Sequence, residues 1–248
     1  MATRTQVRVF SRVEDLFEAA AAEFILTSNA AVRQHGRFSV ALSGGSTPKS
    51  LYSLLASKPA GTVPWGETLF FFGDERHVPP DHPDSNYRMA NEAMLSLVAV
   101  PNHVYRIPAE DPDAALAAQR YESTLRQVFR SQGNEIPRFD LILLGIGPDG
   151  HTASLFPHSS ALHEKSRLVV ANWVQKLQTD RITFTFPLLN SAAKVLFLVA
   201  GRDKASAVEA IFNPDSDPDE FPAKRVNPAS GEVLWLVAAD AAAQLKNV

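Results

Sequence analysis

The sequence predicts an α/β fold, with one mainly parallel sheet covered by helices on both faces. Short apolar runs of strand length recur along the chain, and segments with helical spacing separate them. Several runs end in glycine, as strand-to-helix turns often do. Continuous apolar runs suit strands that are buried on both faces. After one short N-terminal strand, the expected strands are 38–42, 69–72, 141–146, 168–170, 182–186, 195–199 and 233–237.

The first predicted helices have recognisable starts. Residues 14–32 place apolar side chains at helical spacing. Thr47-Pro48 is typical of an N-cap followed by proline at the first helical position, and Asp111-Pro112 repeats the pattern. A helix is therefore expected after each pair.

The C-terminal part continues the alternation. Residues 203–212 have helical spacing, and Asp240 is expected to cap a terminal helix. Residues 213–231 contain four prolines and are expected to form one long surface loop. Only a strand and a short helix follow this loop, so residues 1–248 are predicted to be a single domain.

Composition narrows the class of protein. The chain has 248 residues, 45% hydrophobic and 21% charged, which is typical of a globular domain. It has no cysteine, so disulfides and thiolate chemistry are excluded. A net charge of −3 argues against a broad nucleic-acid surface. No signal-peptide core and no apolar run of roughly 20 residues is present, so the cytoplasm is the expected location. A monomer is expected because no apolar repeat suggests an interface.

A glycine loop follows the strand expected at 38–42. It contains Ser43, Gly44, Gly45, Ser46 and Thr47. Glycine lets backbone N–H groups approach an anion closely, and a helix N-terminus adds partial positive charge. The loop thus suits a phosphate, although a plain strand-to-helix turn needs no ligand. It matches neither the P-loop nor the dinucleotide fingerprint.

Two charged segments follow other strands. Asp74, Glu75 and Arg76 come at the end of the strand at 69–72, where α/β folds bind ligands. Asp149 and His151 lie in a glycine-rich turn after the strand at 141–146. Histidine can take a proton from water near neutral pH, and an aspartate can orient it.

Three further side chains are candidates for binding. Arg181 opens an apolar run, and Lys204 lies at a strand-to-helix junction, so both could complete a phosphate clamp. Asn86 either contacts the ligand or caps a helix. The other histidines lack metal-ligand spacing, and no metal site is predicted.

Together these segments resemble the 6-phosphogluconolactonase family, which shares a superfamily with sugar-phosphate isomerases and deaminases. The motifs are SGGSTP at 43–48, FFGDERHVPPDHPDSNYRMA at 71–90 and LLGIGPDGHTASLFP at 143–157. They are extended by RITFTFPLLN at 181–190, GRDK at 201–204 and VLWLVAADAAA at 233–243. The likeness spans nearly the whole chain.

The resemblance implies a Rossmann-like fold and hydrolysis of 6-phospho-D-glucono-1,5-lactone without a cofactor. It implies His151 as the general base, supported by Asp149. It implies that residues 43–47, Arg181 and Lys204 hold the phosphate. Arg76 would bind the substrate or the developing oxyanion. Asp74 and Asn86 are further candidates for binding, and whether Asp74 or Glu75 faces the ligand is open.

Two alternative functions remain, one within the same superfamily and one from another class. An amino-sugar phosphate deaminase of the same superfamily carries a glutamate five residues after its histidine, where this chain has Phe156. Phenylalanine cannot move protons, which favours the lactonase. A sugar-phosphate sensor needs a DNA-reading module, and the roughly 35 residues before the strand at 38–42 leave no room for one.

Overall fold

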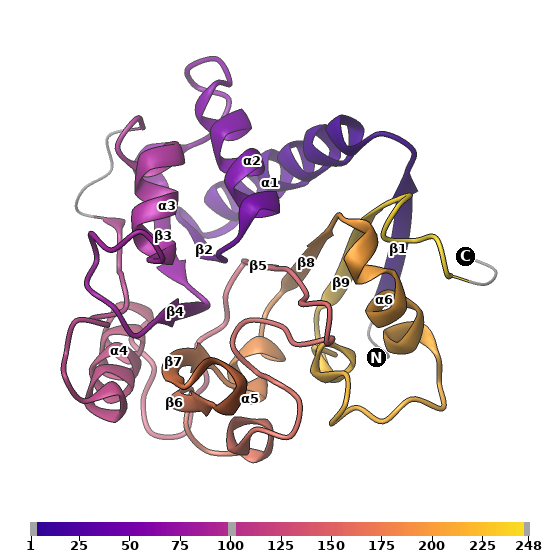
Figure 1. Cartoon of the computed structure of the whole chain (residues 1–248). Helices are drawn as coiled ribbons and strands as arrows, with labels where there is room; N and C mark the ends of the chain where they lie inside the picture. Colours follow the sequence, from indigo (N-terminus) through magenta and orange to yellow (C-terminus); the bar gives the residue numbers. More distant parts are fainter. Residues whose placement is uncertain (1–3, 99–102, 246–248) are drawn as a thin grey trace.

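The main sheet has six parallel strands. The computed structural model describes residues 4–98 and 103–245. The strand order is β1-β9-β8-β5-β2-β3, and every neighbouring pair is parallel. Figure 1 shows this sheet crossing the molecule, with α1 and α2 in the upper part of the view. The strands are β1 Arg4–Phe10, β2 Phe38–Leu42, β3 Thr68–Phe72, β5 Leu141–Leu144, β8 Lys194–Val199 and β9 Glu232–Ala238.

A second, antiparallel sheet was not expected. It has the order β4-β7-β6 and is seen at the lower left of Figure 1. Its strands are β4 Asp74–Arg76, β6 Val169–Val174 and β7 Thr179–Phe184. The runs 168–170 and 182–186 were therefore wrongly assigned to the main sheet. They are the two arms of a hairpin closed by a short 3₁₀ turn, η5 (Gln175–Leu177), and only tertiary pairing with β4 distinguishes them from main-sheet strands.

Helices cover both faces of the main sheet, as predicted. The strand register puts Phe38 and Trp235 on opposite faces. Phe38 packs edge-on against Phe24 of α1, with ring centroids 5.3 Å apart. Trp235 packs against Phe212 of α6 at 5.1 Å. The helices are α1 Val13–His35, α2 Ser46–Ala56, α3 Asn86–Ala90, α4 Ala114–Phe129, α5 Phe186–Leu189 and α6 Ala205–Phe212.

The predicted helix caps were wrong in three places. Helix α2 begins at Ser46, so Gly45 is the N-cap, and its φ of 105° suits glycine alone. Helix α4 is capped by Asp113, whose carboxylate accepts from the next turn. Asp240 caps no helix: in the described residues after β9 the chain forms turns, and Asp240 accepts from the N–H groups of Ala241 and Gly201. Local spacing leaves such one- and two-residue shifts undecided.

The long segment at 213–231 is only partly a surface loop. It contains a 3₁₀ turn, η7 (Pro222–Arg225), and buries Pro222 and Ala223. The Ala223 N–H donates to the Gly150 carbonyl at 3.0 Å. This segment therefore supports the turn that carries the predicted catalytic pair.

Phenylalanine side chains connect the two sheets. Phe139 is fully buried, and its ring lies 5.2 Å from Phe71 of β3, 4.8 Å from Phe129 of α4 and 5.5 Å from Phe184 of β7. This packing connects β7 of the small sheet to β3 and α4. Within the described residues, no helix has the length and apolarity needed to span a bilayer.

Candidate active site

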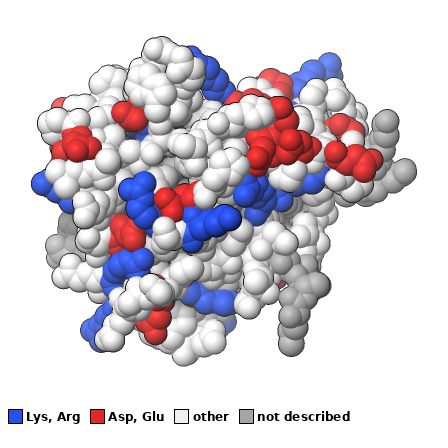
Figure 2. Space-filling model, turned by 90° about the horizontal axis from the view of Figure 1, so that it is seen from below, with Lys and Arg blue, Asp and Glu red and all other residues white. Residues whose placement is uncertain are grey.

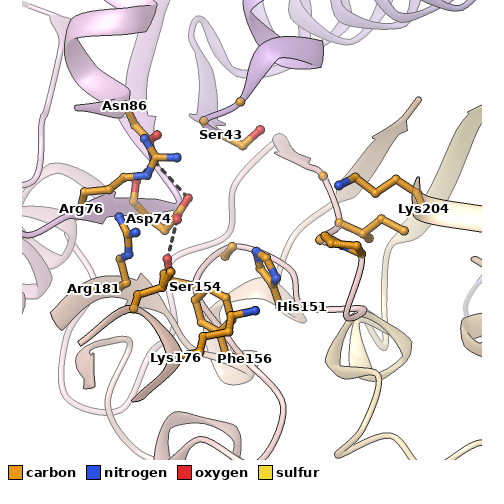
Figure 3. A pocket seen from close by; sticks show the side chains of 18 residues that line it. Ser43, Asp74, Arg76, Asn86, His151, Ser154, Phe156, Lys176, Arg181 and Lys204 are labelled. Carbon is orange, nitrogen blue, oxygen red and sulfur yellow. Dashed lines mark hydrogen bonds between the residues drawn. The ribbon is translucent and has the colours of Figure 1, made fainter. Parts of the chain in front are cut away.

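A cavity of about 370 Å³ opens at the carboxyl ends of β2 and β5, beside the small sheet. Figure 3 shows Arg76 and Arg181 on one side of it, Lys204 on the other and His151 between them. The topology thus collects segments far apart in the sequence. Nine of the predicted site residues line the cavity: Ser43, Gly44, Gly45, Asp74, Arg76, Asn86, His151, Arg181 and Lys204.

Asp149 and His151 form a close pair. Asp149 Oδ1 lies 2.5 Å from His151 Nδ1, and it also accepts from the His151 N–H at 3.3 Å. The contact assigns the proton to Nδ1 and leaves Nε2 as the ring nitrogen able to accept one. Partial burial raises the pKa of Asp149. The hydrogen bond and charge of His151, together with Lys176, outweigh burial and hold that pKa well below its usual range.

The Asp149–His151 pair packs directly against Gly147. A Cβ on Gly147 would lie 2.1 Å from His151 Nδ1 and 2.5 Å from Asp149 Oδ1. The Gly147 N–H donates to the His151 carbonyl at 2.9 Å, which fixes the turn. The sequence motif therefore needs a glycine here for close approach.

Phe156 and Lys176 pack against the pair and, like His151, line the main cavity. The Phe156 ring stacks on the His151 imidazole with centroids 4.1 Å apart and an interplanar angle of 29°. Lys176 pairs with Asp149 Oδ2 and lies 4.7 Å from the Phe156 centroid. Asp149 itself lines a second cavity of about 830 Å³, which shares Phe156 and Lys176 with the main one.

Asp74 is held in the wall of the cavity. Its Oδ2 accepts from Ser154 Oγ at 2.6 Å, and its backbone carbonyl accepts from Asn86 Nδ2 at 2.9 Å. Asn86 lies against Gly44, where a Cβ would be 1.8 Å from Asn86 Oδ1. Asn86 is not the helix cap, because Ser85 caps α3. Asn86 thus joins the glycine loop to β4.

Glu75 faces away from the cavity. Its carboxylate accepts from the N–H groups of Arg76, Asn86 and Tyr87 and from Ser85 Oγ. Burial raises its pKa, and the hydrogen bonds from the three backbone N–H groups offset only part of that rise. Of the two acidic residues at 74 and 75, only Asp74 reaches the site.

Arg76 and Arg181 are cross-strand neighbours. They face one another in the β4–β7 register. Burial, and then the charge of Arg76, lower the pKa of Arg181. Arg76 also donates to the carbonyl of Asp84. Two adjacent guanidinium groups attract an anion, because it relieves their mutual repulsion.

The glycine loop supplies the wall next to Asn86. Helix α2 has no side-chain cap at Gly45, so its first-turn N–H groups have no side-chain acceptor. Ser46 and Thr47 line a smaller hollow of about 150 Å³ rather than the main cavity. Lys204 lines both spaces and pairs with Asp203 at 2.7 Å.

The Ser43 hydroxyl is buried in the cavity wall without a hydrogen-bond partner among the described residues. The Ser43 N–H and carbonyl are both bound by the Tyr52 hydroxyl, at 2.9 and 2.8 Å. A buried hydroxyl in a cavity wall is costly unless a ligand or water satisfies it.

Three residues of the site were missed at the sequence level. Ser154 lies inside the 143–157 motif, so its closeness to Asp149 and His151 was a usable signal. Phe156 was identified only as the residue at the position of the deaminase glutamate, not as a contact of His151. Lys176 lies 25 residues beyond His151 and in no motif, so only the fold of the hairpin brings it to Asp149.

The charge distribution suits a small anion. Figure 2 shows basic and acidic side chains next to one another on the face it displays, not a continuous basic surface. Across the described residues, no cluster of three or more histidine or acidic side chains could hold a metal ion. Cationic groups of the site come instead from arginine and lysine.

Comparison with known proteins assigns the family. The family model described as glucosamine-6-phosphate isomerases/6-phosphogluconolactonase matches residues 11–235. The chain belongs to this family. The 6-phosphogluconolactonase of Nostoc sp. is 44% identical over 229 residues, covering 92% of this chain and 93% of that protein. That of Synechocystis sp. is 43% identical over 242 residues, covering 97% and 98%.

Solved structures of the family have the same fold. The 6-phosphogluconolactonase from Trypanosoma cruzi superposes with a TM-score of 0.88 at 31% identity, covering 100% of this chain and 99% of that one. A monomeric glucosamine-6-phosphate deaminase gives 0.82 at 19% identity, covering 97% and 100%, and so indicates the fold alone. The predicted family and fold class are both confirmed.

Proposed function

We propose that this chain hydrolyses 6-phospho-D-glucono-1,5-lactone to 6-phospho-D-gluconate, the lactone-opening step of the oxidative pentose phosphate pathway. The observation that carries the mechanism is the Asp149–His151 contact of 2.5 Å in a cavity lined by cations. The family and the lactonases at 43–44% identity support the substrate. No cofactor is needed for ester hydrolysis of this kind.

His151 is the general base in this mechanism. Asp149 keeps the ring proton on Nδ1, so Nε2 takes a proton from water as the water oxygen attacks the lactone carbonyl carbon. The imidazolium then gives that proton to the ring oxygen as the C–O bond breaks. Asp149 stabilises the imidazolium between the two steps.

The cations and N–H groups hold the phosphate of the substrate and the negative charge that develops on its carbonyl oxygen during the reaction. The first turn of α2, with Ser46 and Thr47, binds the phosphate together with Lys204, and Arg181 adds a contact from the opposite wall. Arg76 or the Gly44 N–H meets the tetrahedral oxyanion. Holding the distant phosphate orients the reacting carbon, which lowers the barrier.

The deaminase alternative lacks its proton carrier. Phe156 occupies the position of the expected glutamate and stacks on His151. We therefore expect no turnover of glucosamine 6-phosphate. A sensor without activity would bind sugar phosphate but give no turnover of the lactone.

One assay tests the proposal. Fresh 6-phosphogluconolactone is supplied to the wild type, and product is followed with 6-phosphogluconate dehydrogenase. His151→Gln should lower kcat about 10²- to 10⁴-fold, because the base is lost. The matched control His158→Gln changes an exposed histidine paired with Glu220 and should keep full activity. Wild-type turnover no faster than spontaneous hydrolysis would contradict the function, and a fully active His151→Gln would contradict the base. A monomer in the cytoplasm stays a prediction.

A further inference from the structure

Lys176 touches both groups that flank the catalytic imidazole. It lies in the turn η5, between β6 and β7. Its Nζ pairs with Asp149 Oδ2, while the other carboxylate oxygen of Asp149 contacts His151 Nδ1 at 2.5 Å. The same Nζ lies 4.7 Å from the Phe156 centroid, and that ring stacks on His151. The four side chains form a closed ring of contacts.

We propose that Lys176 is a positioning residue that clamps Asp149 and Phe156 around His151 and sets the pH range in which His151 acts as a base. The proposal rests on the proposed function. It assigns a role to the β6–β7 turn, which contains no catalytic side chain itself.

Asp149 contacts both His151 and Lys176, so its negative charge acts on two side chains. If Asp149 faced His151 alone, its full negative charge would stabilise the imidazolium and keep the base protonated to higher pH. Lys176 competes for that charge and adds a positive charge nearby, which favours the neutral imidazole that the first step needs. Hydrogen bonds from both partners hold the carboxylate ionised, in keeping with the lowered pKa of Asp149.

Other charged groups near His151 are already engaged or lie across the cavity. Asp74 is bonded to Ser154, and Lys204 pairs with Asp203. Arg76 and Arg181 line the opposite wall. In the cavity of about 830 Å³ that Lys176 also lines, Glu220 pairs with His158 at 2.9 Å. Asp149 is thus the one carboxylate among the described residues that contacts His151, and Lys176 the one lysine that contacts Asp149.

The size of the effect is limited by solvent. The Lys176 side chain is 52% exposed, so its charge is partly screened. We expect removal of this charge to move the acid limb of the kcat/KM profile upward by about half to one pH unit. At pH 6 the variant should then lose roughly three- to tenfold more activity than at pH 8.

Three variants separate charge from packing. Lys176→Met keeps an apolar stem against Phe156 but removes the charge. Lys176→Arg keeps the charge and should restore the wild-type profile. Lys165→Met is the matched control, since Lys165 is exposed and lines none of the cavities described above. For each, kcat and KM for the lactone are measured from pH 5.5 to 8.5. The titration of the His151 ring proton is followed by NMR, with His151→Gln giving the assignment.

The outcomes are distinct. An acid limb and an NMR titration that both move to higher pH in Lys176→Met, and not in the other two variants, support the clamp. Superimposable profiles and titrations overturn it. A raised KM with an unchanged pH profile also overturns it, because Lys176 would then be a substrate contact. If the wild type has no lactonase activity, the proposed function fails, and the NMR titration still decides whether Lys176 controls protonation of His151.

Discussion

Gly147 allows Asp149 and His151, the proposed catalytic pair, to come into contact. Side-chain atoms of His151 and Asp149 occupy the space where any other residue would place its Cβ, with the nearest atom 2.1 Å away. Phe156 then covers the outer face of the imidazole. At this scale, Gly147 serves packing around the proposed base rather than chain flexibility.

We expect Gly147→Ala to lower kcat about 10²-fold, because the new methyl group must displace the pair from its working geometry. Gly66→Ala is the matched control, since a Cβ at Gly66 meets nothing within 4 Å. Steady-state kinetics and a thermal melt of each variant test the idea. A fully active, folded Gly147→Ala would contradict it.

The β6–β7 hairpin brings cations to the site. It carries Arg181 on one arm and Lys176 in its turn. The chain entering β6 is ordered by Glu164, whose carboxylate accepts from the N–H groups of Ser166 and Arg167 at 2.8 and 3.0 Å. These backbone hydrogen bonds lower the pKa of Glu164 to about 2. Ionised Glu164 therefore stabilises the approach to the hairpin.

Glu164→Gln should lower the free energy of unfolding at pH 7 by about 1 kcal/mol, a value reduced for solvent screening. Because the folded-state pKa is depressed, this contribution is present above the ordinary value of 4.5 and is lost as pH falls towards about 2. The difference between wild type and variant should thus shrink between pH 5 and pH 2.5. Urea unfolding across that range measures it, with Glu67→Gln as an exposed control. A difference that does not change with pH would refute the assignment.

The whole molecule depends on contact between its two sheets. Phe139 packs against β3, α4 and β7 at once, so it connects the strand that precedes β4 to the strand that carries Arg181. Glu122 of α4 adds a polar connection by accepting from the Leu168 N–H at 2.8 Å. The position of the arginine wall follows from this packing.

Phe139→Ala should cost about 3–5 kcal/mol of stability, because it leaves a cavity among buried aromatic rings. Phe139→Leu fills most of that space and should cost less. Urea unfolding gives both values, and lactonase kinetics at low temperature report whether the arginine wall has moved. A loss below about 1 kcal/mol for the alanine variant would mean that the sheets do not depend on this contact.

Local sequence patterns predicted much of the fold. The strand at 38–42 has the same bounds in the structure, because a short apolar run between polar turns favours a buried strand over other structures. The strand expected at 141–146 ends two residues early, where Gly145 begins the turn that carries Asp149 and His151. The start of α4 was shifted because Asp111 and Asp113 compete as caps, and α2 begins directly after Gly45, which has no side chain.

By itself, the sequence determined the α/β class, the glycine loop, the Asp149–His151 pair and the family. These depend on short-range order, which apolar spacing and contiguous motifs record directly. Only the tertiary structure decided that 169–184 forms a second sheet, that Arg181 faces Arg76, and that Lys176 reaches Asp149. Those contacts join segments separated by tens of residues, and they follow from side-chain packing between sheets, which no local pattern encodes.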